Sequence, residues 1–218
     1  MDGRMTKAAA TGNVDELERL MREDMLVLDR IALLGAETPL HIASMRGHVS
    51  FVQKMLELKK QFVYELNQDG FSPMHLASAN GHELLSFAPL TVQAKTSRGE
   101  TPLHIAVKSN QFDAVKFLVK HAKALNMERE VLNDKDNQAN TVLHIAASRK
   151  QYQIVDMLLV AKKVMVVNSV NEREMTPLDV LSLFQSEAGD LEIYRSLVKA
   201  GAKSGKDIEN ENEAGRIR

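Results

Sequence analysis

The chain of 218 residues contains no cysteine and no tryptophan, and its charges nearly cancel, with 28 Lys and Arg against 29 Asp and Glu. The lack of cysteine excludes disulfides and thiolate metal sites, which suits a reducing, cytoplasmic compartment. The balanced charge gives no overall attraction for nucleic acid or anionic lipid. We therefore expect binding to depend on local shape.

Long hydrophobic runs are also missing. A spanning helix needs about 18 consecutive apolar residues, but the richest stretch, 154–167, is interrupted by Asp156, Lys162 and Lys163. The first residues lack the hydrophobic region of a secretory signal. We expect a soluble chain with no direct membrane span.

What the chain does contain is a repeated pattern, Thr-Pro-Leu-His-Ile-Ala. Near-identical copies begin at Thr38, Ser72, Thr101 and Thr141, and a decayed copy begins at Thr176. Successive copies are 34, 29, 40 and 35 residues apart. A period near 33 with this pattern is typical of ankyrin repeats, in which helix pairs stack on their neighbours.

Each copy has the features of a helix start. The Thr or Ser hydroxyl can accept a hydrogen bond from a free backbone N–H, and proline is tolerated at the next position. A residue able to adopt left-handed geometry follows each of the first four helices: Gly47, Gly81, Asn110 and Lys150. The pairs Asp69-Gly70 and Arg98-Gly99 predict tight turns. The expected fold is an all-α solenoid of about six helix-turn-helix units with short β-hairpin fingers.

We expect one ankyrin domain over residues 1–203, with degenerate units at its two ends. The polar segment 204–218 is predicted to be a disordered tail. The predicted repeats lie near 1–35, 36–69, 70–98, 99–138, 139–173 and 174–203.

Two intervals are irregular. In the short third repeat Pro89 limits the second helix to roughly two turns over 83–88, which makes this unit the weakest and suggests that two repeats were joined by a deletion. The long fourth interval predicts an extended helix and loop around 121–133. Ala139 and Glu174 occupy finger positions held by glycine in earlier repeats, so we expect strain there if their φ is positive.

The histidines could suggest a metal or catalytic site. Four of them, His41, His75, His104 and His144, recur at one position of the pattern, where a hydrogen bond from the helix start to a neighbouring turn is the favoured interpretation. Catalysis needs a nucleophile and a base in one cleft, whereas equivalent residues of a solenoid are spaced along it. We expect no catalytic residues, no metal and no cofactor.

The candidate contact surface consists of the first helices and the fingers. We expect these side chains either to contact a protein partner or simply to be solvated. They are Met45, Arg46, Asn67, Gln68, Phe71, Asn80, Arg98, Glu100, Lys108, Ser109, Asn137, Gln138, Arg149 and Arg173.

The segments 66–73, 99–104 and 140–150 resemble plant ankyrin-repeat proteins that carry a C-terminal membrane domain with a Pro-Gly-Gly motif. The resemblance implies a role in plant signalling or defence. We expect the chain to be a non-catalytic, monomeric protein-interaction scaffold, with another protein as partner and no nucleic acid. The sequence ends at Arg218 without such a domain. An alternative is therefore a soluble regulatory fragment, or truncated form, of a membrane-anchored relative, located at the cytoplasmic face of a membrane.

Overall fold

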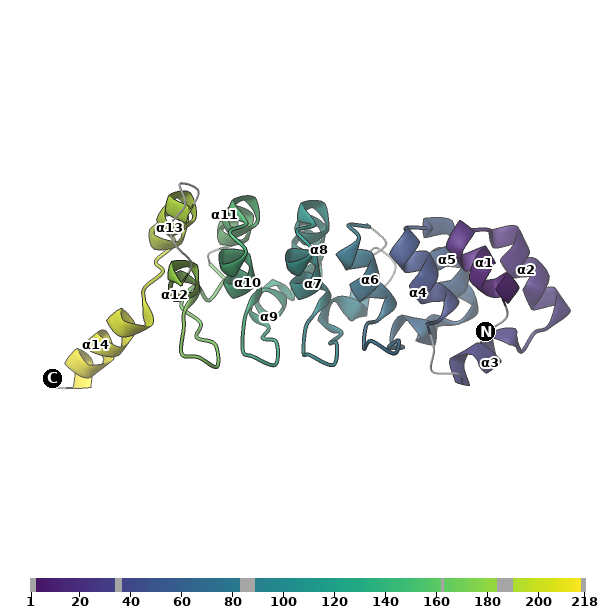
Figure 1. Cartoon of the computed structure of the whole chain (residues 1–218), viewed down its shortest axis with the longest axis horizontal. Coiled ribbons are helices and arrows are strands. Elements are labelled where there is room, and N and C mark those ends of the chain that lie inside the picture. Colours follow the sequence, from purple (N-terminus) through teal and green to yellow (C-terminus); the bar gives the residue numbers. More distant parts are fainter. Residues whose placement is uncertain (1–2, 34–36, 83–88, 162, 184–189, 217–218) are drawn as a thin grey trace. The chain divides into compact units, whose positions relative to one another are not determined.

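The computed structural model describes residues 3–33, 37–82, 89–161, 163–183 and 190–216, and all regular structure among them is helical (Figure 1). The chain divides into two compact units, Met1–His121 and Ala122–Arg218. In repeat proteins each repeat contacts only its neighbouring repeats, so a division of the chain by contacts can fall between two repeats. No described helix is both long and apolar enough to cross a membrane.

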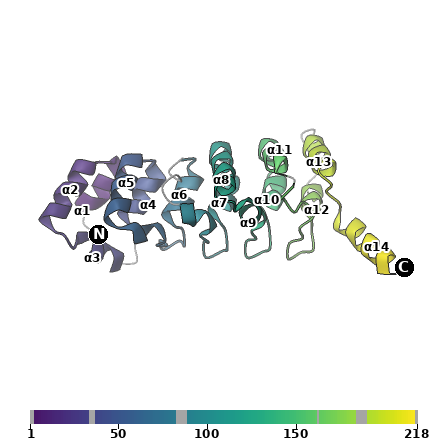
Figure 2. The ribbon, with the colours of Figure 1, turned by 180° about the vertical axis from the view of Figure 1, so that it is seen from behind.

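The described part of the first unit contains four first helices, α1, α4, α6 and α7. Helices α1, α4, α6 and α7 lie side by side in chain order, and α2 packs on α5 (Figures 1 and 2). The bounds are α1 Gly3–Thr11, α2 Val14–Glu23, α3 Val27–Leu33, α4 Pro39–Arg46, α5 Val49–Leu58, the 3-10 helix η1 Lys60–Val63, α6 Pro73–Ala79, the 3-10 helix η3 Pro89–Gln93, α7 Pro102–Lys108 and α8 Phe112–Ala124, which ends just beyond this unit.

The second unit repeats the arrangement with two complete pairs. Helix α10 packs on α12, and α11 packs on α13. The bounds are α9 Glu128–Asn133, α10 Val142–Ser148, α11 Tyr152–Val160, α12 Pro177–Ser182, α13 Asp190–Lys199 and α14 Gly205–Arg216.

The repeated pattern forms helix starts, as predicted. Each Thr or Ser of the pattern is an N-cap, and the side chain three residues later hydrogen-bonds back to the cap. This reciprocal capping box satisfies donors that the first helical turn leaves without partners. The alanine five residues after each cap is fully buried at Ala43, Ala106 and Ala146, which fits the close approach of neighbouring helices.

The residues that follow the first helices adopt left-handed geometry, as predicted. The φ angles are 75° at Gly47, 74° at Gly81, 53° at Asn110 and 55° at Lys150. Glycine is required for space as well as for φ at Gly47, because an added Cβ would lie 2.7 Å from Nδ1 of His82.

The fingers differ from the expected β-hairpins. In the described residues each finger is a tight turn closed by a backbone hydrogen bond, such as Asn67 N to Phe71 O at 2.9 Å, without a strand. The finger residues that replace glycine do adopt positive φ, 58° at both Ala139 and Glu174, against 79° at Gly70. The expected backbone strain at these two positions is therefore present.

The long fourth interval contains an extended helix, as predicted, because α8 spans 13 residues. After α8 the chain turns at Asn126, where φ is 57°, and forms the additional short helix α9. The predicted short second helix over 83–88 lies outside the described residues, and η3 begins at Pro89.

The expected disordered tail was wrong for residues 205–216, which form α14. Ser204 caps this helix, since its Oγ accepts from Asp207 N at 3.2 Å and donates to Asp207 Oδ2 at 2.7 Å. The pattern Ser-Gly-Lys-Asp is a capping box, which the polar composition concealed. Lys203 adds an ion pair to Glu211 at 2.5 Å.

Candidate protein interface

The fingers share one internal framework. In the first, Oδ1 of Asn67 accepts hydrogen bonds from the backbone N–H groups of Asp69 at 3.1 Å and Phe71 at 2.9 Å. Thr96, Asp136 and Asn171 bond the residues two and four positions later in the same way. A polar residue three positions before the left-handed residue therefore fixes each turn. Our sequence reasoning missed this role, although the recurring spacing could have revealed it.

The framework leaves two residues at each tip facing solvent. Between the polar residue and the left-handed residue, all four fingers place two exposed side chains. They are Gln68 and Asp69, Ser97 and Arg98, Asn137 and Gln138, and Glu172 and Arg173. The fixed positions are alike and the tips differ in charge and shape, which is the arrangement expected of a recognition surface.

Three pattern histidines tie their helix start to the next finger, as predicted. Nε2 of His41 lies 3.0 Å from the carbonyl oxygen of Phe71. The same distance separates His75 Nε2 from the oxygen of Glu100, and His144 Nε2 from that of Met175. Because a carbonyl only accepts, Nε2 carries the proton and Nδ1 accepts from the cap residue, at 3.2 Å from Thr38 N.

These imidazoles are held neutral. Burial lowers the pKa of His41 and of His75 to about 4, because a charged ring would lose its hydration there. Burial also lowers the pKa of His144. Their nitrogens are occupied by backbone groups, so these three rings serve as struts between repeats.

A second set of struts joins the helix ends. Nε2 of His48 lies 2.9 Å from the oxygen of Ala10, and Nε2 of His82 lies 3.1 Å from that of Met45. In the next repeat Gln111 takes this role, donating to Ala79 O at 3.3 Å. His48 and His82 therefore have a structural role.

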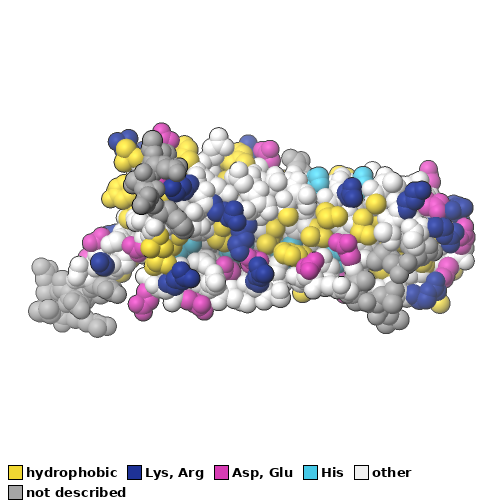
Figure 3. Space-filling view, viewed as in Figure 1, with side chains coloured by type: hydrophobic (Ala, Val, Ile, Leu, Met, Phe, Trp, Pro, Cys, Tyr) yellow, Lys and Arg dark blue, Asp and Glu magenta, His cyan; other side chains and the backbone are white. Residues whose placement is uncertain are grey.

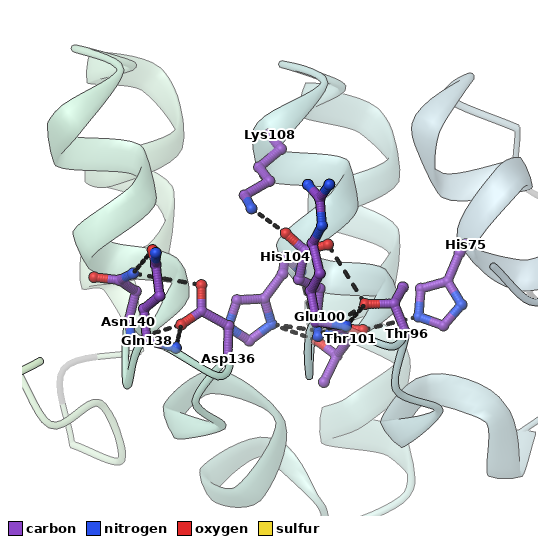
Figure 4. A network of polar contacts seen from close by, with 10 residues as sticks. His75, Thr96, Glu100, Thr101, His104, Lys108, Asp136, Gln138 and Asn140 are labelled. Carbon is purple, nitrogen blue, oxygen red and sulfur yellow. Dashed lines mark hydrogen bonds and ion pairs between the residues drawn. The ribbon is translucent and has the colours of Figure 1, made fainter. Parts of the chain in front are cut away.

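One predicted contact residue is not on the surface. Glu100 is only 3% exposed. One carboxylate oxygen forms an ion pair with Lys108, and the other accepts from Thr96 Oγ1 at 3.4 Å (Figure 4). The expectation that Glu100 faces a partner was wrong, because its side chain folds back over its own finger. It holds Lys108 at the end of α7.

The corresponding finger of the second unit has its own network. Asp136 Oδ1 accepts from Gln138 N at 2.9 Å and Asn140 N at 2.8 Å (Figure 4). Gln138 O accepts from Glu172 N at 3.0 Å, and Asn140 Oδ1 accepts from Asn171 Nδ2 at 2.9 Å. The two fingers of this unit are therefore hydrogen-bonded to one another.

The remaining predicted contact residues divide by exposure. Those that are half-buried also have structural contacts: Met45 O accepts from His82, Asn67 caps its finger, and the Phe71 ring packs edge-on against His75 with 6.3 Å between centroids. Lys108 is half-buried too. The exposed ones are Arg46, Gln68, Asn80, Arg98 and Ser109 in the first unit, and Asn137, Gln138, Arg149 and Arg173 in the second.

The described residues contain no group of three or more His, Asp or Glu side chains that could hold a metal ion. Each described pattern histidine bonds the cap residue of its own helix.

The comparisons with known proteins agree with this architecture. The family profile described as "Ankyrin repeats (3 copies)" matches residues 5–88 and 83–168. The two matches meet at residues 83–88, in the short third repeat.

Relatives come from animals and yeast. The poly(ADP-ribose) polymerase tankyrase of Caenorhabditis elegans is 30% identical over 78% of this chain and 8% of its own length. The probable 26S proteasome regulatory subunit p28 of Saccharomyces cerevisiae is 30% identical over 56% of this chain and 54% of its own. The target of rapamycin complex 2 subunit AVO2, from the same yeast, is 25% identical over 94% of this chain and 47% of its own. The chain thus spans about half or less of each of these relatives.

The family is generally non-catalytic, and the match to tankyrase covers only a small part of that enzyme. The capped helix pairs, the turn fingers and the profile matches over most of the sequence agree. The chain belongs to the ankyrin-repeat family.

Proposed function

We propose that the chain is a non-catalytic scaffold that binds another protein through its finger tips and the exposed residues of its first helices. The observation that carries this proposal is the contrast within each finger. Hydrogen bonds fix the ends of the turn, while the two tip residues are exposed and differ from finger to finger. A rigid support reduces the entropy lost when such side chains are ordered by a partner.

The relatives support an assembly role. Two of them are named as subunits of larger complexes, the 26S proteasome and target of rapamycin complex 2. The chain itself has exposed polar tips, and the rings of His41, His75 and His144 are bound to the backbone, which fits a component that contacts a partner without chemistry. We propose that the chain is itself monomeric before it binds.

The test is affinity capture with tip variants. We replace Gln68, Arg98 and Arg173 by alanine and identify captured proteins by quantitative mass spectrometry. A matched control replaces Lys116, Lys120 and Gln153, exposed polar residues of second helices, by alanine. We expect the tip variant to lose at least one partner that the control retains. Equal capture by both variants would contradict the proposal.

We further propose a role in plant signalling or defence, in the cytoplasm. This rests on the resemblance of segments 66–73, 99–104 and 140–150 to plant ankyrin-repeat proteins. Capture from plant extract before and after treatment with an immune elicitor tests it. Partners that change with treatment are expected, whereas an unchanged set without signalling proteins would contradict this role.

A second candidate is a regulatory fragment or truncated form of a membrane-anchored ankyrin-repeat signalling protein. It rests on the same resemblance. Sequencing the native transcript distinguishes the two: in-frame codons for hydrophobic segments beyond Arg218 would favour the fragment, and a stop codon would favour the independent scaffold.

A further inference from the structure

Helix α13 carries an unpartnered apolar stripe. Leu191, Tyr194 and Val198 are 50%, 46% and 44% exposed, although they follow helical spacing along one face. Figure 3 shows hydrophobic side chains at the surface over this helix. The core contacts of α13 come from other positions, Ile193 and Leu197, which are at most 1% exposed.

The preceding second helix shows what this face does inside the repeat stack. Ile154 and Leu158 of α11 are buried like Ile193 and Leu197 of α13, which aligns the two helices with an offset of 39 residues. Two stripe positions, Tyr194 and Val198, then correspond to Val155 and Leu159 of α11. Those two residues are 0% and 8% exposed, in the helix that packs on α13. The same positions are thus covered in α11 and uncovered in α13.

The direction of the stripe agrees with this comparison. Ser196 of α13 faces α11, since its Oγ lies 3.4 Å from Asp156 Oδ1. At 100° per residue, the centre of the stripe lies roughly 170° around the helix from Ser196. The stripe therefore faces directly away from α11, on the side where a further helix would continue the stack. Helix α14 does not take this place, because it leads away from α13 (Figures 1 and 2).

Helix α2, which is the second helix of the first repeat, has a different outer face. Exposed charges of α2 pair with one another and with α1: Arg19 lies 2.7 Å from Glu16, and Arg4 lies 2.9 Å from Glu23. End repeats normally present such a polar face to water. Helix α13 has an apolar stripe where a polar face is expected. Exposure of this stripe to water costs free energy unless another chain segment covers it.

The charge beside the stripe indicates the kind of partner. Arg195 is exposed on its flank, and it forms no ion pair with a described residue. Arg195 occupies the position that corresponds to Asp156 of α11, the residue that α13 contacts. A helix seated on α13 would meet a basic group at this point.

We propose that the outer face of α13 is a second docking site, which binds an amphipathic α-helix of a partner protein. That helix supplies an apolar stripe for Leu191, Tyr194 and Val198 and an acidic side chain for Arg195. It packs as α13 packs on α11 and so extends the repeat stack with a helix from another molecule. This site is separate from the finger tips.

The test uses the full chain and two labelled helical peptides. Both carry leucines at i, i+3 and i+7, and their polar positions are glutamate in one and lysine in the other. We expect fluorescence anisotropy to show micromolar binding of the acidic peptide, about fivefold or more tighter than that of the basic one. The preference should shrink with added salt, since exposed charges are screened.

Variants locate the binding. Tyr194→Ser with Val198→Ser should abolish it, and Arg195→Glu should reverse the charge preference. Val160→Ser is the matched control, because Val160 is 83% exposed on α11 and outside the stripe. Circular dichroism verifies that each variant remains folded.

Three results would overturn the proposal. The first is that neither peptide binds at 200 μM, which is about tenfold above the expected dissociation constants. The second is that binding survives the stripe variant. The third is that the chain self-associates in analytical ultracentrifugation and that the stripe variant abolishes this self-association. The last would assign the face to a second copy of the chain. The finger-tip variant should bind the peptide normally, so failure here is distinguishable from failure of the scaffold proposal.

Discussion

Acidification should destabilise the first unit through its histidine struts. His41 and His75 have a pKa of about 4 in the folded chain, against 6.5 without the fold. Between these values the unfolded chain binds more protons than the folded chain, so stability rises with pH across this window. At pH 5.0 an unfolded histidine is almost fully protonated, while the buried ones are about one-tenth protonated.

The magnitude follows from the two pKa values. Integrating the proton difference between pH 7.5 and 5.0 gives about 2 kcal/mol for each histidine, and therefore about 4 kcal/mol for the pair. His144 in the second unit contributes in the same direction, since its pKa is also lowered. Below about pH 4 both states are protonated, and this source of pH dependence ends.

Urea unfolding followed by far-ultraviolet circular dichroism at pH 7.5 and 5.0 measures the effect. The control is the double variant His41→Gln with His75→Gln, which cannot titrate at these positions. It should be less stable at neutral pH but should lose about 4 kcal/mol less on acidification. A wild-type free energy that changes by under about 0.5 kcal/mol, or an equal loss in the variant, would refute the reasoning.

Three further changes test the backbone account. Ala139→Gly should raise the melting temperature by about 2 °C, because relief of left-handed strain exceeds the entropy cost of glycine; an unchanged or lower value would contradict the strain at its φ of 58°. Gly47→Ala should lower the unfolding free energy by about 2 kcal/mol, since the new Cβ meets the His82 ring. An unchanged unfolding free energy would contradict the role of His82 as a strut. Asp179→Ala should speed amide hydrogen exchange in α14 about tenfold, because Asp179 Oδ2 accepts from Gly205 N at 2.9 Å. An unchanged exchange rate would show that α14 is stable without this anchor.

The repeated pattern made much of the fold predictable. The cap at Thr38, the proline after it and the left-handed Gly47 are local choices, and local sequence determines them. Positive φ at Ala139 was predictable for the same reason, from its place in the period.

The features that the sequence analysis did not predict depend on individual side-chain contacts that the repeated pattern does not specify. Glu100 has the sequence of an exposed finger residue, yet Thr96 and Lys108 fold it inward. The segment after Ser204 has the composition of a tail, but a cap at Ser204 and an anchor at Asp179 start a helix. The contacts of Glu100 and the cap at Ser204 are short-range but lie outside the repeated pattern, whereas the anchor at Asp179 is a tertiary contact.

The site was predictable in outline only. The period placed fingers and first helices correctly, but our prediction did not separate Asn67, which fixes a turn, from Gln68, which faces solvent. The recurring polar residue three positions before each left-handed residue carries that distinction, and the hydrogen bonds show its physical cause.

The central claim is that finger tips bind a partner while the framework beneath them holds the fold. Capture and thermal unfolding of one variant, with Gln68, Arg98 and Arg173 replaced by alanine, test both halves together. We predict a melting temperature within about 1 °C of the wild type, since exposed side chains contribute little to stability, together with loss of a partner that the second-helix control retains. An unchanged set of partners would contradict the account.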